Sequence, residues 1–273
     1  MKIKMLSILV FFLAFAEALT AQDFQGIATY KSRRQVDLKM EGKNMTDAMQ
    51  KQIADQLKKQ FEKTYTLTFD RNQSLYKEEE KLATPDITSS GGLQIKMSQS
   101  RDVLYKNTAA KRYKRQENVL GKIFLVQDSL QMPQWKLGKE SKSIGDYTCF
   151  KATRTEEVNT QTFASESLKS IDTSFIKTIT VWYTPQIPVS HGPEMNWGLP
   201  GLILEVQDGT QSILCSQLIL NPEQKMEIKA PEGGKIVDEA TIKVIQEDKM
   251  KEWIERNSSN REDGKSFTIK IGG

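Results

Sequence analysis

The sequence predicts a mainly β protein of the α+β class, built as one large curved antiparallel sheet or open half-barrel that two helices cover. Short segments in which apolar and polar residues alternate recur along the 273 residues, which is typical of strands with one buried face. Clusters of Asp, Asn, Gly and Pro separate these segments and indicate turns. Apolar residues recur at helical spacing in only two stretches, residues 45–61 and 242–254.

The first 21 residues have the pattern of a secretory signal peptide. Two lysines near the start precede an apolar run over residues 6–18, and small residues follow. Cleavage after Ala18 also fits the small-residue rule, but we expect cleavage after Ala21, which leaves residues 22–273 as one β-rich domain. The run is shorter than the roughly 20 residues that span a bilayer, so we expect no transmembrane segment in the mature chain and a periplasmic location, with outer-membrane association open.

The charge balance argues against nucleic acid as a partner. The chain has 39 basic and 35 acidic side chains and a formal net charge of +4. Nucleic-acid-binding domains usually carry a strongly basic balance with clustered charge. A nearly neutral exported chain points to a different kind of ligand.

The first half of the chain predicts a strand, a helix and a series of hairpins. Residues 26–31 form the first strand, and residues 45–61 form a helix with an apolar stripe. Residues 64–69 alternate cleanly and turn at Asp70 into a second strand around Tyr76. A long loop is expected at 81–100 and further strands at 103–105, 112–114, 122–126, 135–137 and 146–152.

The second half predicts a polar loop over residues 156–174 and then a hairpin. Asp208 and Gly209 form its two-residue turn, which places Leu204 opposite Ile213 and makes one face of the hairpin apolar. A short strand at 226–228, a helix over 242–254 that ends near 257–259, and a last strand at 267–271 follow.

A six-residue signature stands before this hairpin: Gly198, Leu199, Pro200, Gly201, Leu202 and Ile203. Pro200 and Gly201 fit the two central positions of a type II turn, in which Gly201 takes a positive φ. The signature resembles that of the GLPGLI family, as do Gly145, Tyr147, Cys149, Lys151, Ala152, Trp182, Tyr183, Ile187, Pro188, Gly192 and Pro193. The resemblance implies an exported protein of Gram-negative envelopes from a family whose biochemical role is not established.

The residues assign no catalytic site, metal site or cofactor. His191 is the single histidine, and no zinc, calcium or phosphate-binding motif is present in the sequence. Ser190 stands beside it, but adjacency in sequence does not place a hydroxyl under an imidazole. Cys149 and Cys215 form a candidate disulfide because export permits one, and two separate buried thiols are the alternative.

Aromatic residues around a proline-rich loop predict a recognition site, with Trp197 as its chief anchor. The alternative is that these side chains cap the core. The candidate binding residues are Trp182, Tyr183, Pro188, His191, Pro193 and Trp197.

Three functions compete. The first is a non-enzymatic periplasmic or outer-membrane-associated binding protein for a peptide, a lipid or an outer-membrane protein, with a fold like the open half-barrel of periplasmic lipoprotein carriers, an analogy that assigns no function. The second is an envelope hydrolase that uses Ser190 and His191. The third is a structural subunit of an outer-membrane assembly.

Overall fold

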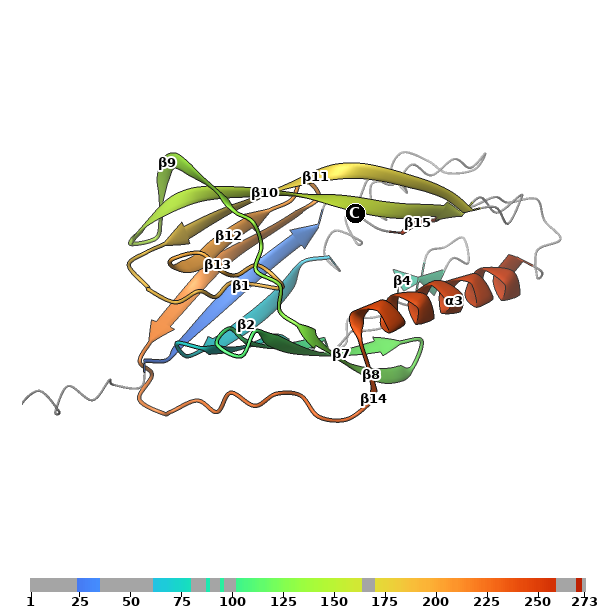
Figure 1. Ribbon diagram of the computed structural model, residues 1–273, viewed down its shortest axis with the longest axis horizontal. Coiled ribbons are helices and arrows are strands. Elements are labelled where there is room, and N and C mark those ends of the chain that lie inside the picture. The colour runs from blue at the N-terminus through green and yellow to red at the C-terminus, as the bar shows by residue number, and fades with distance from the viewer. Residues whose placement is uncertain are drawn as a thin grey trace, which may run out of the picture.

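A 13-stranded sheet curves around a central space without closing on itself (Figure 1). The computed structural model describes residues 24–34, 61–79, 87–88, 94–95, 102–163, 170–258 and 269–271. The strand order is β14-β8-β7-β6-β3-β2-β1-β13-β12-β11-β10-β15, and β9 pairs with β10 beside this path. The predicted mainly β class and the curved, open sheet are therefore confirmed.

The strands begin and end as follows. The first half contains β1 (Gly26–Arg34), β2 (Lys63–Phe69), β3 (Gln73–Glu78), β6 (Val103–Asn107), β7 (Arg112–Val119) and β8 (Lys122–Ser129), with a separate small pair of β4 (Ile87–Thr88) and β5 (Gln94–Ile95). The second half contains β9 (Lys136–Ile144), β10 (Tyr147–Phe163), β11 (Ser170–Thr184), β12 (Leu202–Gln207), β13 (Gln211–Leu220), β14 (Lys235–Val237) and β15 (Ile269–Ile271).

The helix α3 (Glu239–Ser258) confirms the second predicted helix. Asp238 caps it, because its carboxylate accepts a 2.7 Å hydrogen bond from the backbone N–H of Thr241. Figure 1 shows α3 inside the curve of the sheet, and Ile242 is fully buried. The other predicted helix, up to residue 60, and the expected signal peptide lie outside the described residues. None of the helices among the described residues is long and apolar enough to cross a membrane.

The polar stretch 156–174 does not form the predicted loop. Its described residues extend β10 and β11 into a long hairpin arm, visible at the top of Figure 1. Threonine is common in this stretch of the sequence, and its branched side chain favours strands. Cross-strand pairs support the register, among them Thr153 with Thr180, Thr155 with Thr178, and Glu156 with Lys177.

Two details after the signature also differ from the predictions. The turn of the β12–β13 hairpin is Gly209–Thr210 rather than Asp208–Gly209, so Val206 instead of Leu204 lies opposite Ile213. The Asp208 carboxylate causes this shift, because it accepts hydrogen bonds from the next backbone N–H groups.

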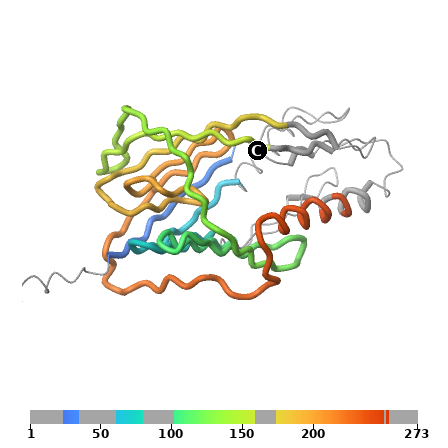
Figure 2. Tube along the Cα trace, viewed as in Figure 1, coloured from blue at the N-terminus to red at the C-terminus, as the bar shows by residue number. Residues whose placement is uncertain are grey.

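Residues 226–228 are not a strand. Figure 2 shows the segment 221–234 crossing the molecule in extended form towards β14. There β14 pairs with β8 in the one parallel pairing of the described sheet.

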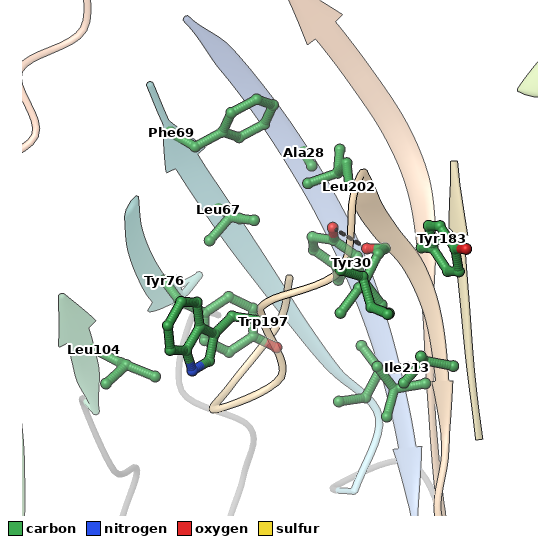
Figure 3. Close-up of a cluster of buried hydrophobic side chains, with 14 of the residues drawn as sticks. Ala28, Tyr30, Leu67, Phe69, Tyr76, Leu104, Tyr183, Trp197, Leu202 and Ile213 are labelled. Atoms are coloured by element: carbon green, nitrogen blue, oxygen red, sulfur yellow. Dashed lines mark hydrogen bonds between the residues drawn. The ribbon is translucent and has the colours of Figure 1, made fainter. Parts of the chain in front are cut away.

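The concave face is the side of the sheet that carries Tyr30, Leu67 and Tyr76, which adjoin one another in the β1–β2–β3 register. Tyr113 lies on the same face, and its hydroxyl donates to Glu239 of α3. A hydrophobic core packs against this face, and Figure 3 shows part of it. Its largest side chains include Tyr30, Phe69, Leu67, Ile187, Leu199, Leu202, Ile203 and Leu204.

Candidate functional site

The signature loop, residues 185–201, joins β11 to β12 and folds back into the core. Backbone hydrogen bonds run from Leu202 N to Ile187 O at 3.0 Å and from Ile203 N to His191 O at 3.0 Å. Ile187, Val189 and Leu199 are buried. The loop therefore fills part of the concave face instead of projecting from the molecule.

The candidate binding residues are mostly part of this packing. Trp197 is 5% exposed, and its indole N–H donates to Gln131 O at 3.1 Å. Tyr183 and Pro193 are buried, while Pro188 is exposed. A partner's anchor needs an accessible ring, so the structure favours the alternative that these aromatic groups cap the core.

Trp182 lies on β11, next to Tyr183 in the sequence and outside the signature loop. Its half-buried ring is 4.4 Å from the ammonium group of Lys142, which also pairs with Glu205 at 2.6 Å. The cation–π contact holds Lys142 against the sheet. The six candidates therefore do not converge on one surface.

Ser190 and His191 do not form a dyad. The Ser190 hydroxyl donates to Leu199 O at 3.0 Å, and His191 Nε2 donates to Asp70 O at 3.0 Å. Burial, with the nearby charge of Lys106, lowers the pKa of His191 to about 3, so the ring is neutral at pH 7. His191 Nδ1 is buried and has no hydrogen-bond partner. This histidine ties the loop to the β2–β3 turn, and the geometry gives no support to a serine hydrolase.

The two signature glycines do not have the predicted role, in which Gly201 takes a positive φ in a type II turn. Gly201 is not among the residues with positive φ, whereas Gly198 has φ 90°. A Cβ on Gly201 would lie 2.2 Å from Thr184 O. Gly201 is therefore required because β11 and β12 approach closely at this point, and the type II turn assignment is wrong.

Lys106 is the most unusual residue beneath the loop. It lies on β6, its side chain is fully buried, and its ammonium group donates to Gly192 O at 2.8 Å and to Glu194 O. Burial lowers the pKa of Lys106 to about 7, although the charge of Glu194 opposes the shift. Lys106 thus holds the tip of the loop by its backbone.

Glu194 is the residue at this tip. Its backbone is left-handed, with φ 52°, which is costly for a residue other than glycine. One carboxylate oxygen accepts a 3.1 Å hydrogen bond from Gln211, whose amide N–H groups also bond to Ser32. Burial raises the pKa of Glu194 above the ordinary value of a glutamate. Its other oxygen has no hydrogen bond within the described part of the chain.

Two stacked tyrosines lie beside Glu194. The rings of Tyr65 and Tyr76 are 4.8 Å apart and 10° from parallel. Burial and then the charge of Glu194 raise the pKa of Tyr76. Tyr76 lies opposite Leu104 of β6, two residues along the same face from Lys106, which bonds to Glu194 O. Tyr76 is 5% exposed, and its hydroxyl has no hydrogen-bond partner. We call Glu194, Tyr65, Tyr76 and Gln211 the Glu194 site.

Several acids of the described chain have a salt-bridge partner, whereas none is found for Glu194. The pairs are Lys177 with Asp208 at 2.8 Å, Lys63 with Glu78 at 2.8 Å, and Arg154 with Glu156 at 2.5 Å.

The remaining site predictions concern cysteines and metals. Cys149 and Cys215 are free thiols, the first buried and the second half-buried, so the candidate disulfide is not formed in this structure. Among the described residues no group of three His, Cys, Asp or Glu side chains could hold a metal ion.

The sequence contained a signal for Lys106, which holds the tip of the loop, but none for Glu194. Lys106 follows Leu104 in the alternation of β6, so its inward direction could be inferred from the sequence. Glu194 lies in an irregular loop, where no periodicity predicts direction.

Comparison with known proteins finds one family model, described as a protein of unknown function (Porph_ging), which matches residues 135–205. This segment contains β9 to β11 and the signature loop, about a quarter of the chain, and agrees with the expectation of an uncharacterised family without confirming the GLPGLI name. No curated protein matches.

Two solved structures of PNGF-II, in the C2 and P21 space groups, are distantly similar to this chain. Their identities are 13% and 14%, and their TM-scores are 0.49 and 0.48. The matches cover 83% and 82% of this chain but 33% and 34% of theirs, so the chain spans about a third of the length of these structures.

Proposed function

We propose that this chain is an exported, non-enzymatic binding protein of the cell envelope that holds a polar ligand at the Glu194 site. The observation that carries the proposal is Glu194 itself, a half-buried carboxylate on a left-handed backbone with a single hydrogen bond and no salt-bridge partner among the described residues. The buried Tyr76 hydroxyl, which has no hydrogen-bond partner, lies on the same face of the sheet as Lys106, which bonds to the Glu194 backbone. Of the ligands expected from the sequence, a peptide segment suits these polar groups better than a lipid chain.

These features reduce the stability of the folded chain. A strained backbone position and a buried polar group without a partner each cost on the order of 1–3 kcal/mol. Strain of this kind is concentrated at functional sites, where a ligand supplies the missing interactions. The matched case is Glu205, a buried acid that is paired with Lys142 and also bonded to Gln207.

The unfolding of two glutamine variants tests the proposal. In urea melts at pH 7, Glu205→Gln should lose about 1–3 kcal/mol because it breaks a buried ion pair. Glu194→Gln keeps the shape and the bond to Gln211 and removes a half-buried charge that has no salt-bridge partner among the described residues, so its midpoint should stay the same or rise. If Glu194→Gln loses as much as Glu205→Gln, the carboxylate is structural and the proposal fails.

Export is tested separately by the intact mass of the protein recovered from the periplasm. We expect a chain that begins at Gln22, and a chain that retains Met1 contradicts export. The third reading, a subunit of an outer-membrane assembly, stays a prediction.

A further inference from the structure

Glu194 differs from the acids around it in having no salt-bridge partner among the described residues. Lys177 neutralises Asp208, and Lys63 neutralises Glu78. The ammonium group of Lys106 is directed at two backbone carbonyls, and Arg34 bonds to the Gln211 side chain at 3.3 Å rather than to the Glu194 carboxylate. A carboxylate without a salt-bridge partner among the described residues therefore remains in a half-buried position.

The neighbouring tyrosines complete a recognisable set of groups. The Tyr76 hydroxyl oxygen is a second unfilled acceptor, and its residue is more than nine-tenths buried. The stacked rings of Tyr65 and Tyr76 supply aromatic surface with a negative face. Carboxylates and aromatic faces together are typical of sites that recognise organic cations.

We propose that the Glu194 site binds a cationic group of its ligand, an ammonium or guanidinium group, with its N–H donors directed at the Glu194 carboxylate and the Tyr76 hydroxyl. The inference rests on the proposed function and names the chemical class that the site takes. An ammonium or guanidinium group carries only donors, so its N–H groups match the free carboxylate oxygen of Glu194 and the acceptor lone pairs of the Tyr76 hydroxyl. The charge-assisted bond to the carboxylate provides most of the affinity.

Binding should depend on pH because the carboxylate must be ionised. Burial raises the pKa of Glu194, and the groups that act on it are Asp208 from the β12–β13 turn, Arg34 of β1 and Lys106 of β6. Tyr65 of β2 and Tyr76 and Glu78 of β3 face the same space. Affinity for a cation should therefore fall as the pH decreases through the raised pKa of Glu194.

Calorimetric titration with small probes tests the inference. The probes are a short capped peptide with one lysine, the same peptide with that lysine acetylated at Nζ, a capped peptide with one arginine, and free putrescine. We expect at least one cationic probe to bind at least tenfold more tightly than the acetylated peptide. Binding of a peptide identifies a side chain as the source of the cation, and binding of putrescine alone identifies a free amine.

Two variants and one control locate the binding. Glu194→Gln should weaken the bound probe at least tenfold, and Tyr76→Phe should weaken it to a smaller degree. Glu140→Gln changes an exposed acid on β9 that pairs with Lys151, and it should leave the affinity unchanged. Equal affinity for the acetylated peptide, no binding of any cationic probe, or an unchanged affinity in Glu194→Gln overturns the inference. The proposed function is judged independently by the unfolding of Glu194→Gln.

Discussion

In the body of the signature loop, the polar side chains of Ser190 and Trp197 donate to backbone carbonyls and the apolar groups are buried. At its tip, the Glu194 carboxylate accepts one hydrogen bond, and the buried hydroxyl of Tyr76 on β3 has no partner. One loop thus contains a part that stabilises the fold and a part that reduces its stability. The contrast teaches that the aromatic groups of this loop belong to the support, and that the candidate site is at the tip that they hold in place.

The largest expected change in the free energy of unfolding comes from a substitution in the body of the signature loop. Gly201→Val places a branched side chain where the Cβ alone would overlap the Thr184 backbone at 2.2 Å, and backbone cannot move aside cheaply. We expect a loss of about 4 kcal/mol or more in urea melts. Gly209→Ala is the matched control, because its φ is 89° but no atom lies within 4 Å of the new Cβ. It should cost only about 1–2 kcal/mol. Equal losses in the two variants would mean that backbone conformation, not space, determines the requirement for glycine.

The next effect is a pH dependence at His191. The pKa of His191 is about 3 in the folded chain, compared with 6.5 for an ordinary histidine. The folded state therefore favours the neutral ring. The stability from this preference is complete above pH 6.5 and is lost as the pH falls towards 3. Between pH 7 and pH 4.5 the loss should be about 3 kcal/mol.

Urea melts of wild type and His191→Gln at both pH values isolate this contribution, because the carboxylates that titrate in the same range are shared by the two proteins. The difference between the melts at the two pH values should be smaller in the variant. The same difference in both would show that His191 is not the titrating group.

The smallest effect separates two neighbouring tyrosines. The rings of Tyr30 and Tyr76 are 6.3 Å apart, but the Tyr30 hydroxyl donates to Ile203 O at 2.7 Å, the bond drawn in Figure 3. Tyr30→Phe should lose about 1 kcal/mol, whereas Tyr76→Phe should lose nothing measurable. A comparable loss from Tyr76→Phe would show that its hydroxyl has a structural partner, and the contrast within the loop would disappear.

The fold class could be predicted because alternation reports which face of a strand is buried. That signal is clear in β2, where Tyr65, Leu67 and Phe69 alternate with threonines, and it fails in the β10–β11 arm, where the sequence over residues 156–174 is mostly polar. The hairpin register was wrong for a local reason, because the Asp208 side chain moves the turn by one residue. These are contacts that periodicity does not describe.

The site could be predicted less well than the fold. The aromatic and proline content of the signature loop correctly marked a structured segment, but composition does not distinguish an exposed ring from a buried one, and Trp197 is buried. Glu194 gave no signal at all, since its importance comes from the absence of a partner. Whether an acid forms a salt bridge depends on residues of other segments, as Lys177 does for Asp208 and Lys63 does for Glu78.

The central position of β1 has a consequence for how the chain reaches this structure. β1 pairs with β2 on one side and with β13 on the other, and Gly26 lies opposite Leu220. Two strands so distant in sequence must meet before the middle of the sheet is complete, and such long-range pairing makes folding slow, typically milliseconds to seconds. A nascent chain that ends before β13 therefore has one unpaired edge along β1, which is open to pairing with other chains.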